Sequence, residues 1–190
     1  LARAETPLTL DDAAAKKPLG DLLDKSGAGK FMDDAHLTVG GLIEGSWTIS
    51  DSSPPGNNIT GRYFDFENQD LTLNQIDVYL ERAVDGTKGH VDVGGRIELI
   101  YGGDSRLIHS LGLMDYHGIY NVPAGTNKGP NEQLDLNQAY LDFAVPVGNG
   151  VLVRAGKFNT LLGYEVINPT GNAFYSHSFL FGFAIPLTNT

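Results

Sequence analysis

Apolar and polar side chains alternate along several segments of this chain from residue 36 onward. The clearest segment is residues 91–101, in which Val91, Val93, Ile97, Leu99 and Tyr101 alternate with Asp92, Arg96 and Glu98. Successive side chains of a β-strand point to opposite faces of a sheet, so a period of two predicts strands with one apolar and one polar face. The pattern predicts about six strands, within residues 37–48, 75–81, 91–101, 137–145, 151–156 and 179–185.

The connections between these predicted strands alternate in length. Residues 49–73, 102–131 and 159–175 are long and rich in loop-forming residues, whereas Asp85-Gly86 and residues 146–150 make short turns. Transmembrane β-barrels have short turns at the periplasmic rim and longer loops outside. Structureless connections of such length are uncommon in a compact soluble domain. The rhythm of the connections therefore favours a membrane barrel over a soluble sandwich.

The predicted fold class is all-β: an antiparallel up-and-down transmembrane β-barrel, of which about six strands lie in this sequence. The smallest barrels of this type have about eight strands. An open sheet edge in lipid would leave backbone hydrogen-bonding groups unpaired. We therefore expect residues 35–190 to be the N-terminal strands of a larger barrel, which continues beyond residue 190.

The N-terminal region differs from the rest of the chain. Ala2-x-Ala4 is the small-x-small pattern that precedes signal-peptidase cleavage, so residues 1–4 are a candidate signal-peptide remnant. Residues 5–34 are polar and acid-rich, and we expect them to form a periplasmic N-terminal arm. The sequence leaves open whether this arm is a short helix or a flexible segment.

Charged and polar residues of the predicted strands fall on the face opposite the valines and isoleucines. In a barrel the apolar face meets lipid and the polar face meets the lumen, whereas in a soluble sandwich the same polar face would be the solvated exterior. The barrel interpretation predicts a set of pore-lining residues: Glu44, Gln75, Asp77, Glu81, Asp92, Arg96, Glu98 and Arg154. Acidic residues outnumber arginines in this set, which favours a weak cation preference.

Composition excludes several other functions. The chain has 23 acidic and 13 basic residues, a formal net charge of −10, which argues against nucleic acid as a partner. It has no cysteine, and its five histidines lack paired metal-ligand spacing. Carboxylates such as Asp77 and Glu98 are more readily explained as parts of a pore charge ladder than as a catalytic pair. We therefore predict no catalytic residue, no metal and no cofactor.

The connection at residues 159–175 is a candidate constriction loop. Gly163, Pro169 and Gly171 would allow this segment to bend towards the lumen. On that interpretation Tyr164, Glu165 and Asn168 approach the pore. The alternative is a surface loop packed on the rim of the barrel.

Particular motifs add a family resemblance. They include Gly156-Lys157-Phe158-Asn159-Thr160-Leu161-Leu162-Gly163-Tyr164-Glu165, Asn168-Pro169, Phe174-Tyr175-Ser176, Arg62-Tyr63-Phe64-Asp65 and Asp135-Leu136-Asn137-Gln138-Ala139-Tyr140. Over residues 36–190 the chain resembles the β-barrel porin-2 (OmpL-like) family, most specifically around residues 156–178. The resemblance implies a bacterial outer-membrane barrel of the porin type with poorly defined substrates.

The expected function is passive diffusion of small polar solutes or ions through a water-filled barrel in the outer membrane of a Gram-negative-type bacterium. The expected partners are outer-membrane lipid and lipopolysaccharide, together with the solutes; a homo-oligomer is compatible with the sequence. A non-conducting barrel acting as an adhesin or structural anchor is the alternative. A soluble secreted carbohydrate-binding β-sandwich is a third, less favoured interpretation.

Overall fold

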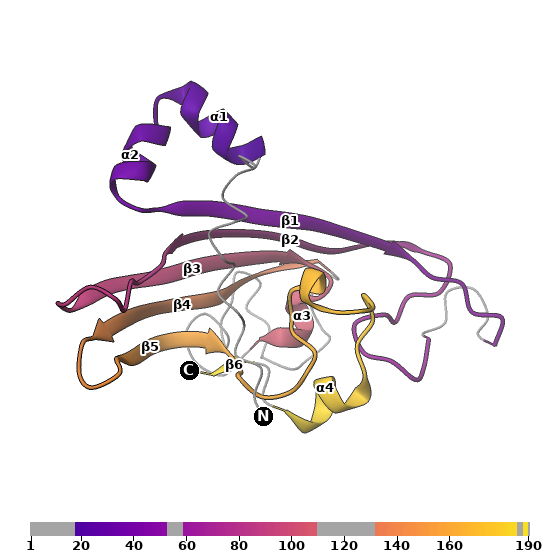
Figure 1. Ribbon diagram of the computed structural model, residues 1–190. Coiled ribbons are helices and arrows are strands. Elements are labelled where there is room, and N and C mark those ends of the chain that lie inside the picture. Colours follow the sequence, from indigo (N-terminus) through magenta and orange to yellow (C-terminus); the bar gives the residue numbers. More distant parts are fainter. Residues whose placement is uncertain (1–17, 53–58, 110–131, 186–187, 190) are drawn as a thin grey trace.

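The chain forms one antiparallel sheet whose neighbouring strands follow the order of the sequence (Figure 1). The computed structural model describes residues 18–52, 59–109, 132–185 and 188–189. The strands are β1 (Thr38–Trp47), β2 (Leu71–Arg82), β3 (Asp92–Gly102), β4 (Gln133–Val145), β5 (Val151–Asn159) and the two-residue β6 (Thr188–Asn189). The predicted all-β, antiparallel, up-and-down arrangement is confirmed for β1–β5.

The connections between the strands keep the predicted rhythm. Residues 48–70, 103–132 and 160–187 make long connections, whereas residues 83–91 and 146–150 make short ones. Because each strand is antiparallel to its neighbours, the long connections all lie at one end of the sheet and the short ones at the other.

The two faces of the sheet carry different side chains. Cross-strand pairs such as Val78 with Leu99 and Ile97 with Ala139 share one face, and its large apolar side chains are exposed. They include Ile43, Val78, Leu80, Val93, Ile97, Leu99, Leu141, Val151 and Val153. An exposed apolar surface of this extent is abnormal for a protein in water. We call this surface the apolar face and the opposite one the polar face.

The predicted strand at residues 179–185 is wrong. Phe179–Ala184 form a short helix, α4, which begins after Ser178, and the Ser178 hydroxyl oxygen accepts a hydrogen bond from the backbone N–H of Phe181. Phe181 is 3% exposed whereas Phe183 is 74% exposed, so the aromatic residues do not share a face. The alternation of phenylalanines mimicked a strand, but the N-cap and the single buried side chain favour a helical turn.

The described parts of the long connections pack on the polar face, where some of their side chains form a hydrophobic cluster. The helical parts of these connections are α3 (Ser105–Ile108), the 3₁₀ turn η2 (Pro169–Gly171) and α4. The buried members of this cluster, called here the loop core, are Tyr63, Phe64, Ile100, Ile108, Ile167 and Phe181. Ile100 belongs to β3 and lies on the polar face beside Asp77 of β2, so the loop core is seated directly on the sheet.

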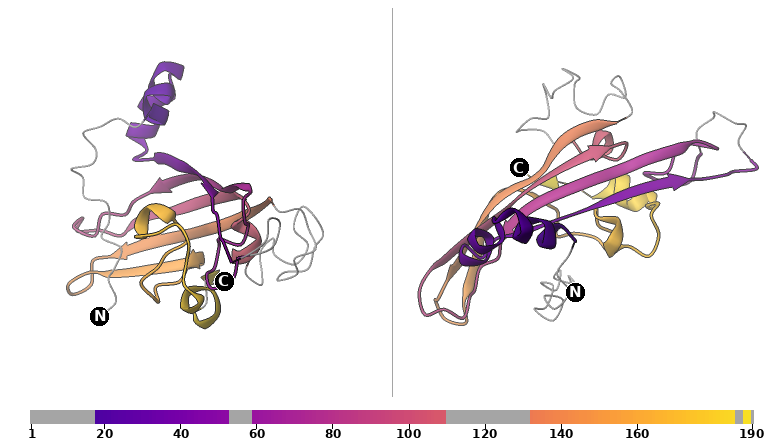
Figure 2. Two further views of the ribbon diagram at one scale, coloured as in Figure 1. Left: turned by 90° about the vertical axis from the view of Figure 1, so that its right-hand side faces the viewer. Right: turned by 90° about the horizontal axis from the view of Figure 1, so that it is seen from above.

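The N-terminal region contains two short helices, α1 (Pro18–Ser26) and α2 (Gly29–Asp34). Gly27, with φ +82°, ends α1, and the backbone N–H groups of Gly27 and Ala28 donate to the last carbonyls of the helix. Both helices lie at the end of the sheet opposite α3 and α4 (Figures 1 and 2). The helical alternative is thus the correct one for residues 18–34. The candidate signal-peptide remnant at residues 1–4 lies outside the described residues.

Within the described part of the chain, none of the helices has the length and apolarity needed to span a bilayer.

Candidate functional site

The eight residues predicted to line a pore all lie on the polar face. Strand register brings together Glu44 with Gln75, Glu81 with Arg96, and Asp142 with Arg154. Asp77 and Glu98 follow the same alternation, and Asp92 lies at the start of β3. The sequence therefore identified one continuous surface, although whether that surface meets water in a pore stays a prediction.

Arg96 is the centre of one charge network on this face. Its Nε donates to Glu98 Oε2 over 2.5 Å, and its Nη1 lies 3.2 Å from Glu81 Oε2. The guanidinium also stacks on the ring of Tyr79, 3.8 Å from the ring centroid. Gly40 of β1 leaves room for that ring, because a Cβ atom there would lie 2.3 Å from the Tyr79 hydroxyl. The charge of Arg96 is thus balanced by two carboxylates and fixed in place.

Arg154 is held in the same way further along the sheet. Its Nε and Nη2 each lie 2.8 Å from one oxygen of Asp142, which is a bidentate ion pair. Its guanidinium lies 3.8 Å from the centroid of the Tyr140 ring. Both predicted pore-lining arginines are therefore neutralised by acids of their own face.

Glu98 has two amide partners outside the predicted pore-lining set. Asn137 Nδ2 donates to Glu98 Oε1, and Gln138 Nε2 donates to Glu98 Oε2 over 3.0 Å. Consecutive residues of a regular strand point to opposite faces, but the register between β3 and β4 shifts at Glu98/Leu99. This bulge turns both amides to the polar face, and no local sequence signal marks it.

Gln75 connects the sheet to the long connections. Its Nε2 lies 3.3 Å from Glu44 Oε2, 3.1 Å from Asp104 Oδ2 and 3.3 Å from the carbonyl oxygen of Ile167. Sequence reasoning missed Asp104, because it follows β3 and was assigned to a loop. Burial, followed by the nearby carboxylate of Glu44, raises the pKa of Asp104.

Asp92 has a different environment from the other predicted residues. Its carboxylate accepts from Arg82 Nη2 over 3.0 Å and from the backbone N–H of Asp85 over 2.8 Å, and Lys88 Nζ lies 3.3 Å away. These contacts tie the short connection 83–91 to the start of β3. The main effect of Asp92 is therefore to hold the turn.

The connection after β5 crosses the polar face, as the Gln75–Ile167 contact shows. Tyr63 and His177 exchange two backbone hydrogen bonds of 2.8 Å, so the first and third long connections also pair with each other. Burial lowers the pKa of His177, whose ring lies 4.5 Å from that of Phe64 between centroids. This connection is therefore anchored by packing and by polar contacts.

The three residues predicted at the constriction have different roles. Tyr164 is 76% exposed. The Glu165 carboxylate accepts from the backbone N–H of Ser178 over 3.1 Å, and Asn168 Oδ1 accepts from the backbone N–H of Thr170 over 2.9 Å. Glu165 and Asn168 thus shape the loop, while Ile167, which composition did not single out, is the residue that contacts the sheet.

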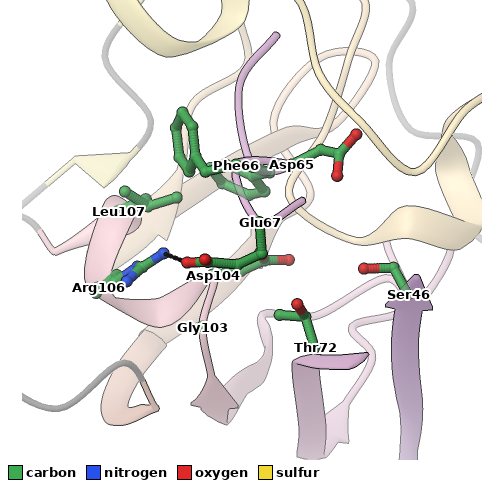
Figure 3. A pocket seen from close by; sticks show the side chains of 10 residues that line it. Ser46, Asp65, Phe66, Glu67, Thr72, Gly103, Asp104, Arg106 and Leu107 are labelled. Atoms are coloured by element: carbon green, nitrogen blue, oxygen red, sulfur yellow. Dashed lines mark hydrogen bonds and ion pairs between the residues drawn. The ribbon is translucent and has the colours of Figure 1, made fainter. Parts of the chain in front are cut away.

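A small hollow lies where β1–β3 meet the long connections (Figure 3). The polar side chains that line this hollow are three carboxylates, two hydroxyls and one cation: Asp65, Glu67 and Asp104, Ser46 and Thr72, and Arg106. Arg106 Nη2 lies 3.4 Å from Glu67 Oε1. The described residues contain no cluster of three or more side chains suited to hold a metal ion.

Comparison with known proteins gave one match. The model of a family described as putative beta-barrel porin-2, OmpL-like, matches residues 36–190. No curated protein and no solved structure matched the chain.

Proposed function

Because the chain belongs to the beta-barrel porin-2 (OmpL-like) family, we propose that it is an outer-membrane porin. In this proposal the strands span the outer membrane as part of a closed barrel, the apolar face contacts lipid, and small polar solutes or ions diffuse passively along the polar face. The family is of a non-enzymatic type, and no catalytic step is part of the proposal.

The observation that carries this proposal is the difference between the two faces of one sheet. Large apolar side chains are exposed on one face, whereas the charges of the other are organised in ion pairs and hydrogen bonds. Transmembrane barrels require this arrangement, because the outer surface meets hydrocarbon and the interior is polar. A soluble sandwich would need a second sheet against the apolar face, and the described strands form a single sheet.

Single-channel recording of the purified full-length protein in a planar bilayer tests the proposal. A porin gives discrete, ohmic conductance steps whose size scales with salt concentration. Folded protein that inserts into the bilayer without conductance would contradict it and favour the alternative, a closed barrel acting as adhesin or anchor. The loop core favours that alternative to some degree, because it occupies part of the polar face.

The constriction is tested separately at Tyr164. The chain has no cysteine, so Tyr164→Cys introduces a unique reactive thiol on an exposed side chain. Modification with a bulky charged thiol reagent should lower the conductance if Tyr164 projects into the solute path. Phe31→Cys in α2, at the other end of the sheet, is the matched control. Equal responses of the two variants would place Tyr164 outside the path.

A further inference from the structure

Four carboxylates gather on the polar face of β1–β3 near the long connections. They are Glu44, Asp77, Glu98 and Asp104, and we call them the acidic strip. Gln75 bridges two of them, since its Nε2 donates to Glu44 and to Asp104. Asp77 lies two residues along β2 from Gln75, and its charge interacts with that of Glu98. Asp77, Glu98 and Asp104 are all buried.

The cations nearby do not balance this strip. Arg96 pairs with Glu98, but it is shared with Glu81. Arg154 donates two hydrogen bonds to Asp142, from Nε and Nη2. Arg96 also interacts electrostatically with Asp77, and Arg106 does so with Asp104, but Arg106 is shared with Glu67. The strip therefore has more carboxylates than cations beside it.

Asp77 has an unusual environment for a carboxylate. Its side chain is 3% exposed, and Oδ1 has no hydrogen-bond partner. Burying an unpaired carboxylate is costly unless an opposite charge compensates it. Asp135 also has carboxylate oxygens without a hydrogen bond, but Lys157 Nζ lies 3.5 Å from its Oδ1. Glu98 and Asp104 accept hydrogen bonds from side-chain amides. A free acceptor oxygen beside further carboxylates is suited to a cation.

The strip also connects to the hollow at the end of the sheet. Asp104 belongs to both, and Asp65 and Glu67 are two further carboxylates among the residues that line the hollow (Figure 3). The hydroxyls of Ser46 and Thr72 add neutral oxygen ligands there. Oxygen groups are therefore present both at the rim of the sheet and, through Gln75, next to Asp104 and Glu44.

We propose that the acidic strip is a cation pathway, and that Asp77 determines selectivity for small monovalent cations over anions. This inference rests on the proposed porin function and names the solute class of that pore. Conduction requires sites that attract an ion but release it readily. The strip meets this requirement because its carboxylates are spread over β1, β2, β3 and the residues after β3, and the described residues hold no compact group of the kind that binds a divalent metal.

The test is the reversal potential of the full-length protein in a planar bilayer under a KCl gradient. We expect the wild type to prefer K⁺ to Cl⁻. Asp77→Asn should lower the ratio of K⁺ to Cl⁻ permeability by about threefold or more. The reason is that a buried unit charge acts strongly on an ion in a narrow path. Glu44→Gln should lower it in the same direction and serves as a second variant if Asp77→Asn does not fold.

Two further variants make the test specific. Asp85→Asn removes the same charge from the exposed short connection and keeps the oxygen that accepts from Thr87, so the ratio should not change. Arg154→Gln should raise the ratio, because it leaves Asp142 without its partner. Conductance with anion preference, or an equal effect of Asp77→Asn and Asp85→Asn, would overturn the cation pathway and leave the porin proposal standing. Absence of conductance would overturn both.

Discussion

The sheet and the loop core follow different physical rules. In β1–β5, apart from the register shifts at Glu44/Gly45 and Glu98/Leu99, the face of a residue follows from its position in the alternation, and pairing is between strands adjacent in sequence. In the loop core, contacts join residues far apart, such as Gln75 with Ile167 and Tyr63 with His177. The structure of the sheet therefore follows from local sequence patterns, whereas a few long-range contacts hold the connections on the sheet.

The largest effect is expected where the loop core loses its most buried aromatic ring. Phe181→Ala should cost about 3–5 kcal/mol of local stability, the usual range for a buried Phe. Residues 160–185 should then exchange their amide hydrogens faster, while β2 and β3 remain protected. Phe183→Ala is the matched control, because that ring is 74% exposed. Loss of protection in the strands as well would contradict the independence of the two regions.

A charge on the apolar face tests the sheet itself. Ile97→Lys should reduce the free energy of folding into lipid by about 2–4 kcal/mol, as a lysine facing the bilayer centre does. Leu152→Lys is its counterpart on the polar face; the two side chains are 56% and 58% exposed. Urea titration in liposomes measures the difference. Equal tolerance of both lysines would indicate that the apolar face meets water.

The contact between the two regions can be broken at Gln75. Gln75→Leu leaves Glu44, Asp104 and the Ile167 carbonyl without their shared donor, which should cost about 1–3 kcal/mol. We expect faster hydrogen exchange at residues 165–170 and a change in single-channel conductance. Gln138→Leu, which removes a polar-face amide away from this contact, should leave that exchange unchanged. A loop that behaves identically in both variants would show that Gln75 does not hold it.

The smallest effect is expected from pH. Burial lowers the pKa of His177 below its ordinary value of 6.5, so the unfolded segment binds a proton more readily than the packed one. The stabilisation of the packed connection by neutral His177 is therefore complete above pH 6.5. It is lost as the pH falls through the lowered pKa of His177. Hydrogen exchange at residues 174–178 should accelerate on acidification by an amount equivalent to about 1 kcal/mol or less. His177→Gln should show a smaller pH dependence; an unaltered one would exclude His177 as its source.

The difference between the sheet and the loop core explains which parts of the structure could be predicted from the sequence. Alternation places Glu44, Asp77 and Arg154 on one face, because face depends only on position along a strand. It does not find Asn137, since a bulge changes the register there. It misassigns residues 179–185, because Phe64, which packs against Phe181, lies more than a hundred residues away along the chain. Ile167 was missed for the same reason, because it contacts Gln75 only after its connection folds back. Asp104 was missed because it continues the pairing of β2 with β3 just beyond the end of the predicted strand.

The most direct test of the central claim compares two neighbouring residues of β2. Single spin labels at Leu80→Cys and Glu81→Cys, in a chain that has no other cysteine, report contact with lipid or water. In liposomes, Leu80→Cys should be relaxed mainly by oxygen, which concentrates in lipid, and Glu81→Cys mainly by a water-soluble nickel complex. Nickel-dominated relaxation at both positions would contradict a sheet with one lipid-facing and one water-facing side.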